Sequence, residues 1–202
     1  MSDAAPTLFA DNLAALKSVA PDLARQLEKI TEPHTRIVQD PSGGIDLALC
    51  DQGMYGGDAR AYADKQVADF LAKPSRVFLE RPDPERLAGV VGDFTVRVEE
   101  RLKSEALATA PGGDVPDAHF LFSFGVGLGL HLERLIAVTS PRVVVLIEPN
   151  LEFLWHSLHV VDWRKLLQTD EKAARSFVFI TERDSARIAN AAGQIILSHN
   201  SA

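Results

Sequence analysis

Cysteine, basic clusters and long apolar runs are scarce or missing in this sequence of 202 residues. The one cysteine, Cys50, can form no internal disulfide and has no CxxC companion for zinc, so a reducing cytoplasm is the expected location. With a formal net charge of −7 and no basic run, the chain is not expected to bind nucleic acid through its phosphates. No apolar run is long enough to span a bilayer and the first residues show no secretory signal, so no membrane partner is expected.

The remaining composition is that of an ordinary globular protein, with 46% hydrophobic and 24% charged residues. A chain of this length can bury a core without disulfides or metals. Two segments are rich in turn-forming residues: 40-DPSGG-44, and 109-TAPGGDVPDA-118, which is typical of a linker. Because the second segment divides the chain, we predict an N-terminal part over residues 1–110 and an α/β unit over residues 111–202.

The N-terminal part mixes helical and strand patterns. Apolar residues at helical spacing predict two helices near the start, and Pro21 suits the first turn of the second because its missing N–H would have no partner there. Asp58 is expected to cap a later amphipathic helix. The predicted elements are two helices in 7–30, a β-hairpin over 36–50, a helix over 58–73, a strand over 76–80 and interrupted helical segments over 84–108.

In the α/β unit the pattern changes to buried strands that alternate with helices. Apart from Arg142, residues 142–147 are all apolar, as in a strand covered on both faces of a sheet. The alternation predicts a Rossmann-like parallel sheet with right-handed crossovers, half of a doubly wound fold, preceded by the smaller helical and hairpin part. The predicted elements are strands over 119–124, 142–147 and 176–180, and helices over 128–138, from Leu151, from Asp162 and over 184–198.

A glycine loop with the sequence GVGLG lies between the first predicted strand and its helix, which is the context that a nucleotide-binding loop requires. Gly125, Gly127 and Gly129 allow a sharp turn and let backbone N–H groups approach a ligand at a helix N-terminus. Glu148 ends the next strand, where an acidic residue commonly holds a ribose hydroxyl. The pattern therefore indicates a pocket for a nucleotide, a nucleotide sugar or adenosylmethionine. A tight turn without any ligand, and a Glu148 that caps the next helix at Asn150, explain the same residues.

His131, just after the glycine loop, is a further candidate ligand-binding residue. It either faces a ligand or packs against the loop. Residues 126–133 contain no Lys or Arg that could balance a phosphate, and Glu133 adds negative charge one turn into the helix. The partial charge of a helix N-terminus would then hold a phosphate without help. We therefore expect a cleft at this place that binds small molecules weakly or not at all.

Residues 120–167 carry a series of short motifs in a fixed order. A glycine-rich loop comes before a His-Leu pair, the next strand ends in Glu-Pro, and an aromatic-rich helix leads to an Asp-Trp segment. In this sequence they are His131-Leu132, Glu148-Pro149, Phe153 with Trp155, and Asp162-Trp163. Together with the helical start over 12–30, the series resembles the N-terminal domain of the motility accessory factor (Maf) family of flagellin glycosyltransferases. The resemblance reaches nearly the whole chain and is most specific over 120–167.

The resemblance implies a part in glycosylation of the bacterial flagellum. Maf proteins are thought to transfer a nonulosonic, sialic-acid-like sugar from a CMP donor to Ser or Thr of flagellin, and their central domain carries a Gly-Pro-Ser-Leu loop. No such loop occurs in this sequence. We therefore expect the N-terminal portion of a longer protein, without catalytic residues or a cofactor of its own, that positions or contacts the acceptor. The CMP-nonulosonic acid donor belongs to the full-length enzyme, flagellin is the expected partner, and self-association stays open.

Two other functions fit the same residues. A small adenosylmethionine-dependent methyltransferase also uses a GxGxG loop and a downstream acid, although too few strands follow the loop for its complete sheet. A non-catalytic scaffold or dimerisation domain is the other alternative, because a fold by itself does not specify a function. The spacing of His156, His159 and Asp162 suits one side of a helix, but we expect partly buried or capping side chains there and no metal site.

Overall fold

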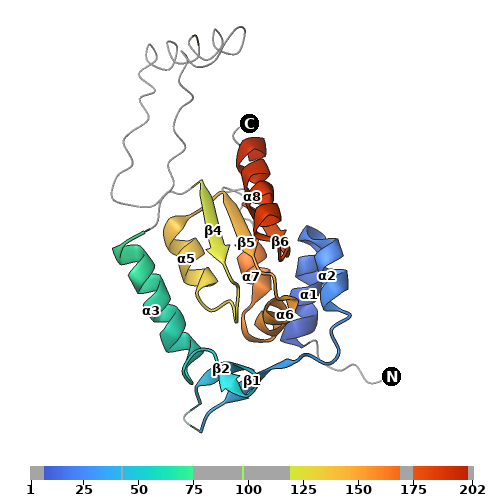
Figure 1. The fold of residues 1–202 in the computed structure, drawn as a ribbon, viewed down its shortest axis with the longest axis vertical. Coiled ribbons are helices and arrows are strands. Elements are labelled where there is room, and N and C mark those ends of the chain that lie inside the picture. The colour runs from blue at the N-terminus through green and yellow to red at the C-terminus, as the bar shows by residue number, and fades with distance from the viewer. Residues whose placement is uncertain (1–6, 42, 75–96, 98–118, 169–174, 200–202) are drawn as a thin grey trace.

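The computed structural model places the N-terminal helices against the α/β unit (Figure 1). The residues that it describes are 7–41, 43–74, 97, 119–168 and 175–199. The predicted strand over 76–80 and the linker over 109–118 lie outside these residues, as do the helical segments over 84–108 apart from residue 97. The division of the chain near residue 110 therefore stays a prediction. Within the described residues, no helix has the length and apolar character that crossing a membrane requires.

The N-terminal helices and the hairpin form where the sequence predicts them. Thr7 caps the first helix, since its hydroxyl accepts the Ala10 N–H at 3.3 Å, and Pro21 occupies the first turn of the second. The side chain of Asp58 accepts two backbone N–H groups at the start of α3. Strands β1 and β2 pair antiparallel, and β2 also pairs with β3. The bounds are α1 (Leu8–Val19), α2 (Pro21–Leu27), β1 (Thr35–Gln39), β2 (Ile45–Leu49), β3 (Gln52–Gly53) and α3 (Ala59–Ala72).

The α/β unit is built on a parallel sheet with the strand order β4-β5-β6, which confirms the predicted Rossmann-like arrangement. The central strand β5 is buried along its whole length, as its unbroken apolar sequence predicts. Phe122, Val145 and Val178 lie side by side across the three strands. The bounds are β4 (Phe120–Phe124), α5 (Leu132–Thr139), β5 (Val143–Ile147), α6 (Leu151–Val160), α7 (Trp163–Leu167), β6 (Ser176–Ile180) and α8 (Ser185–His199).

The helix after β4 begins later than the sequence predicts. We expected a helix over 128–138, whereas α5 begins at Leu132. The φ angles are +53° at Gly127 and +76° at Gly129, and the Gly129 N–H donates to the Val126 carbonyl at 2.8 Å, so the turn continues beyond the glycines. The prediction was wrong over its first turn, because left-handed glycines interrupt a helix that apolar spacing alone suggests.

One hydrophobic core joins the N-terminal helices to one face of the parallel sheet. It contains Leu16 of α1, Leu27 of α2, Val144 of β5 and Trp163 of α7, each fully buried. The opposite face of β5 packs against α8, with Val145 at its centre. Helices therefore cover both faces of the sheet, as in a doubly wound fold, and the core contains residues from both sides of the predicted division.

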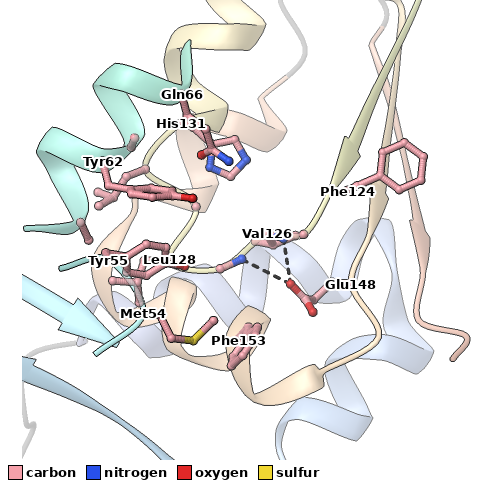
Figure 2. A pocket seen from close by; sticks show the side chains of 16 residues that line it. Met54, Tyr55, Tyr62, Gln66, Phe124, Val126, Leu128, His131, Glu148 and Phe153 are labelled. Atoms are coloured by element: carbon pink, nitrogen blue, oxygen red, sulfur yellow. Dashed lines mark hydrogen bonds between the residues drawn. The ribbon is translucent and has the colours of Figure 1, made fainter. Parts of the chain in front are cut away.

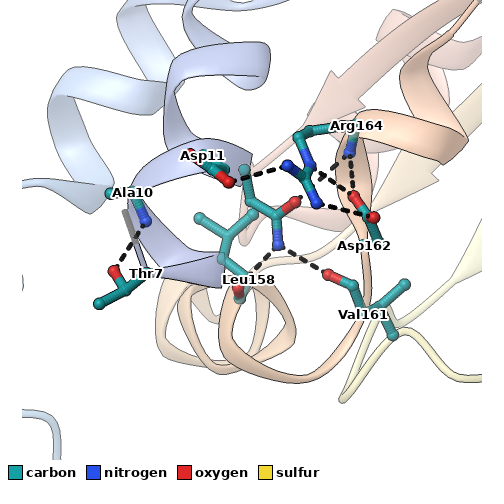
Figure 3. A network of polar contacts seen from close by, with 8 residues as sticks. Thr7, Ala10, Asp11, Leu158, Val161, Asp162 and Arg164 are labelled. Carbon is teal, nitrogen blue, oxygen red and sulfur yellow. Dashed lines mark hydrogen bonds and ion pairs between the residues drawn. The ribbon is translucent and has the colours of Figure 1, made fainter. Parts of the chain in front are cut away.

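A buried asparagine ties α1 to the end of α6 (Figure 3). Asn12 is fully buried, and its Nδ2 donates to the carbonyls of Leu158 at 2.8 Å and Val161 at 2.7 Å. Beside it the Arg164 guanidinium contacts the Asp11 carboxylate at 2.8 Å. A buried amide needs such partners, because burial removes its hydrogen bonds to water. These contacts set the position of α1 on the α/β unit.

Candidate functional site

The candidate site lies at the carboxyl ends of β4 and β5, which is where open parallel sheets bind their ligands. The glycine loop leaves β4 at Gly125, whose N–H donates to the Ile147 carbonyl at 2.8 Å and so continues the strand pairing by one residue. Gly125, Gly127 and Gly129 all have positive φ angles, of 86°, 53° and 76°. Since side chains disfavour that conformation, glycine is needed at these positions to form the turn itself.

Glu148, the first residue after β5, binds the glycine loop directly. Its Oε2 accepts the N–H of Val126 at 2.8 Å and that of Gly127 at 3.3 Å, and its Oε1 accepts the N–H of Asn150 at 3.0 Å. The side chain is 4% exposed, so the carboxylate is bonded within the protein (Figure 2). Both oxygens are therefore engaged with backbone donors, at the loop and at the start of α6.

The last glycine of the loop is bonded as well. Its N–H donates to the Val126 carbonyl at 2.8 Å. With the bonds to Ile147 and Glu148, the backbone N–H groups of Gly125, Val126, Gly127 and Gly129 all have partners in the protein. A phosphate at this loop would have to displace a buried carboxylate, whereas Rossmann-type loops offer unoccupied donors.

A pocket of about 190 Å³ lies between the glycine loop and α3 (Figure 2). Tyr62 and Gln66 reach it from α3, and Tyr55 reaches it from the turn before that helix. The rings of Tyr55 and Tyr62 are 5.2 Å apart between centroids, with an interplanar angle of 55°. The lining residues are Met54, Tyr55, Ala59, Tyr62, Ala63, Gln66, Phe124, Gly125, Val126, Gly127, Leu128, Gly129, Leu130, His131, Glu148 and Phe153.

Asp46 of β2 holds the turn that carries Tyr55. Its Oδ1 accepts the N–H groups of Leu47 at 2.6 Å, Met54 at 3.0 Å and Tyr55 at 2.8 Å, and its Oδ2 accepts the Gly57 N–H at 2.7 Å. Burial alone would raise the pKa of this carboxyl, but the donated N–H groups outweigh it and lower the pKa. The carboxylate thus fixes the turn, and with it the Tyr55 hydroxyl beneath the glycine loop.

His131 contributes a neutral imidazole to the pocket. Burial lowers its pKa from 6.5 to about 4, so the ring is uncharged at neutral pH. The Ser123 hydroxyl donates to the Gly125 carbonyl at 3.3 Å and lies 3.2 Å from His131 Nε2. Nε2 and the Ser123 hydroxyl therefore share a hydrogen bond. A neutral imidazole has one donor and one acceptor nitrogen, so Nδ1 is left for a further partner.

The chain matches the family model for the glycosyltransferase Maf N-terminal domain over residues 8–201. It belongs to this family. The structure is also similar to that of a Maf glycosyltransferase from Magnetospirillum magneticum AMB-1, with a TM-score of 0.66 and 24% sequence identity. That match covers 91% of this chain and 28% of the other, so this chain spans less than a third of that protein and the likeness concerns the fold. A comparison with curated proteins found no match.

In this Maf N-terminal domain the pocket contains all the candidate ligand-binding residues of the sequence: the three loop glycines, His131 and Glu148. That they bind a ligand stays a prediction. Sequence reasoning missed the opposite wall, which Tyr55, Tyr62 and Gln66 form. Both tyrosines of the chain gather there, but nothing in their spacing links them to a loop that begins at residue 125.

The histidines of α6 have structural partners. His156 Nε2 lies 3.0 Å from the carbonyl oxygen and 2.9 Å from the hydroxyl of Thr35, and His159 stacks on Phe9 with ring centroids 4.4 Å apart. Asp162 caps α7. In the part of the chain that the structure describes, no three His, Cys, Asp or Glu side chains are grouped closely enough to hold a metal ion.

Proposed function

We propose that this chain is the N-terminal module of a glycosyltransferase that attaches a nonulosonic sugar to Ser or Thr of flagellin. In this proposal the module positions or contacts the acceptor protein, and the chemistry takes place elsewhere in the full-length enzyme. Membership in the Maf N-terminal domain family supports a role in a glycosyltransferase. The observation that carries the non-catalytic role is the Glu148 carboxylate, which occupies the loop donors that a donor nucleotide would need.

Electrostatics argue against a CMP-sugar in this pocket. Its phosphate would meet the buried charge of Glu148, and the lining residues that the structure describes include no Lys or Arg to offset the repulsion. The same geometry weighs against an adenosylmethionine-dependent methyltransferase. In such an enzyme the acid after the second strand binds the ribose hydroxyls, whereas both oxygens of Glu148 accept backbone N–H groups here.

Two measurements on the 202-residue chain test this proposal. The first incubates the chain with a CMP-nonulosonic acid and purified flagellin and follows glycosylation by intact-protein mass spectrometry. We expect no transfer, and turnover would contradict the non-catalytic role. The second measures binding of flagellin to the immobilised chain by biolayer interferometry, with serum albumin as a control. We expect saturable binding of flagellin alone, and its absence would contradict acceptor contact.

Sedimentation of the same sample separates acceptor contact from the scaffold alternative. We expect the chain to sediment as a monomer by itself and as a larger species when flagellin is added. A stable dimer that does not respond to flagellin would support the dimerisation domain and contradict the proposal.

A further inference from the structure

The pocket presents polar groups that no other described residue uses. The hydroxyl of Tyr62 and the amide of Gln66 have no hydrogen-bond partner within the described ranges, and both side chains line the cavity. His131 lines the same cavity, and its Nδ1 atom likewise has no hydrogen-bond partner among the described residues. An amide that donates and accepts, a hydroxyl that does both, and an imidazole nitrogen therefore surround one small space.

The same pocket offers a ligand no cation, and its carboxylate is already bonded. Among the described residues that line it, Glu148 is the only Asp, Glu, Lys or Arg, and its carboxylate is buried and bonded to backbone N–H groups. The nearby Arg134 of α5 is paired with Asp64 of α3 at 3.3 Å. His131 is neutral at pH 7 because burial disfavours its charged form. An uncharged ligand therefore suits the pocket better than a phosphate or a carboxylate does.

Size and shape narrow the ligand further. A dry cavity of about 150 Å³ accommodates benzene, so a pocket of about 190 Å³ has room for a single six-membered ring. Tyr55 and Tyr62 supply aromatic surface, and Figure 2 shows them together on the α3 side of the pocket, whereas the Phe124 ring points away from them. Aromatic faces pack against C–H groups, while the neutral polar groups bind hydroxyls.

We propose that this pocket binds an uncharged, hydroxyl-bearing six-membered ring, with a neutral monosaccharide unit as the ligand class. The ring packs on Tyr62, and its hydroxyls bond to the Tyr62 hydroxyl, the Gln66 amide and Nδ1 of His131. The site is formed before the ligand arrives, because Asp46 holds the Tyr55 turn and Glu148 holds the glycine loop. From the sequence we expected weak or absent binding of small molecules in general, and we now keep that expectation for charged ligands only. The proposal does not rest on a role in flagellin glycosylation.

The test is a titration of the ¹⁵N-labelled 202-residue chain, followed by NMR. The neutral probes are the methyl β-glycosides of glucose, galactose and N-acetylglucosamine, and methyl β-lactoside tests a sugar at the end of a glycan. The charged probes are N-acetylneuraminic acid, CMP and inorganic phosphate. We expect at least one neutral glycoside to shift the Gln66 side-chain amide and the Gly127 amide, with a Kd of about 1 mM, which corresponds to weak binding.

Variants identify the binding residues. Gln66→Ala and Tyr62→Phe should each weaken the glycoside about fivefold, as expected for one lost hydrogen bond, and Tyr62→Ala should weaken it about tenfold because aromatic packing is lost too. Gln26→Ala, the same change on the exposed surface of α2, should leave binding unchanged. Gln66 is exposed, so its variant should fold normally.

The proposal is overturned if no neutral glycoside binds, or if a charged probe binds as tightly as the neutral glycosides do. It is also overturned if Gln66→Ala and Tyr62→Ala bind the glycoside with the same Kd as the unaltered chain. None of these outcomes depends on flagellin. A failure here is therefore distinguishable from a failure of the proposed function, which is measured by flagellin binding and sugar transfer.

Discussion

Glu148 holds its Oε2 atom 2.8 Å from the backbone nitrogen of Val126, so a side chain of the protein occupies the donors of its own glycine loop. In nucleotide-binding proteins with this fold, such donors face the ligand's phosphates. Here the carboxylate of Glu148 and the loop N–H groups are hydrogen-bonded to each other. A sequence pattern that usually indicates a cofactor site can therefore be used for internal structure alone.

Replacing Glu148 should open the loop to anions. In Glu148→Ala the Val126 and Gly127 N–H groups lose their acceptor, which should lower the free energy of unfolding by about 2–3 kcal/mol, as for hydrogen bonds to a charged group. The unsatisfied donors should then accept phosphate, so millimolar phosphate should raise the melting temperature of the variant and leave the unaltered chain unchanged. Glu133→Ala, at an exposed acid in the first turn of α5, is the matched control. An equal phosphate response in both variants would contradict this reading.

Alanine at Gly127 should cost more stability than alanine at Gly125. Both residues have positive φ angles, so each substitution pays a backbone strain of about 1–2 kcal/mol. A Cβ at Gly127 would also lie 2.1 Å from the Tyr55 hydroxyl, whereas a Cβ at Gly125 would meet nothing within 4 Å. Urea unfolding of both variants isolates the Tyr55 contact as the difference between them. Equal losses would mean that Tyr55 does not pack beneath the loop.

Asn12→Ala should destabilise the chain by about 2–4 kcal/mol, because the change removes two hydrogen bonds and leaves the buried carbonyls of Leu158 and Val161 without this donor. Asn190→Ala, at an exposed position of α8, should change the free energy of unfolding by less than about 0.5 kcal/mol. Urea denaturation followed by tryptophan fluorescence measures both. A small effect of Asn12→Ala would show that α1 is held by its apolar contacts alone.

Acidification should remove the contribution of Glu152 to stability. Burial alone would raise the pKa of this carboxyl, but hydrogen bonds from His34 and Thr35 outweigh it and lower the pKa from 4.5 to about 2. The stabilisation is therefore fully present above pH 4.5 and is lost as the pH falls toward 2. The unaltered chain should be more stable than Glu152→Gln at pH 7, and the difference should shrink through this window. A difference that stays constant in urea unfolding between pH 7 and 2.5 would contradict the assignment.

Local patterns were enough to predict most elements of this fold. The parallel strands β4, β5 and β6, the hairpin, the Pro21 start of α2 and the Asp58 cap of α3 depend on residues only a few positions apart. Periodicity, capping and turn chemistry act over such distances, so they can be recognised in one sequence. The late start of α5 was missed because apolar spacing continues through the left-handed glycines.

The tertiary structure alone decided what surrounds the glycine loop. The sequence marked the loop glycines, His131 and Glu148 as a site, and they do line one pocket. It did not indicate that Glu148 would accept the loop N–H groups, or that Tyr55 and Tyr62 would form the opposite wall. A carboxylate at a strand end can bind a ligand or the adjacent loop with the same spacing in sequence. Only the three-dimensional arrangement of the strand end and the loop selects between these partners. The packing of α3 and the hairpin then adds the tyrosines, because tertiary packing decides which polar groups become buried together.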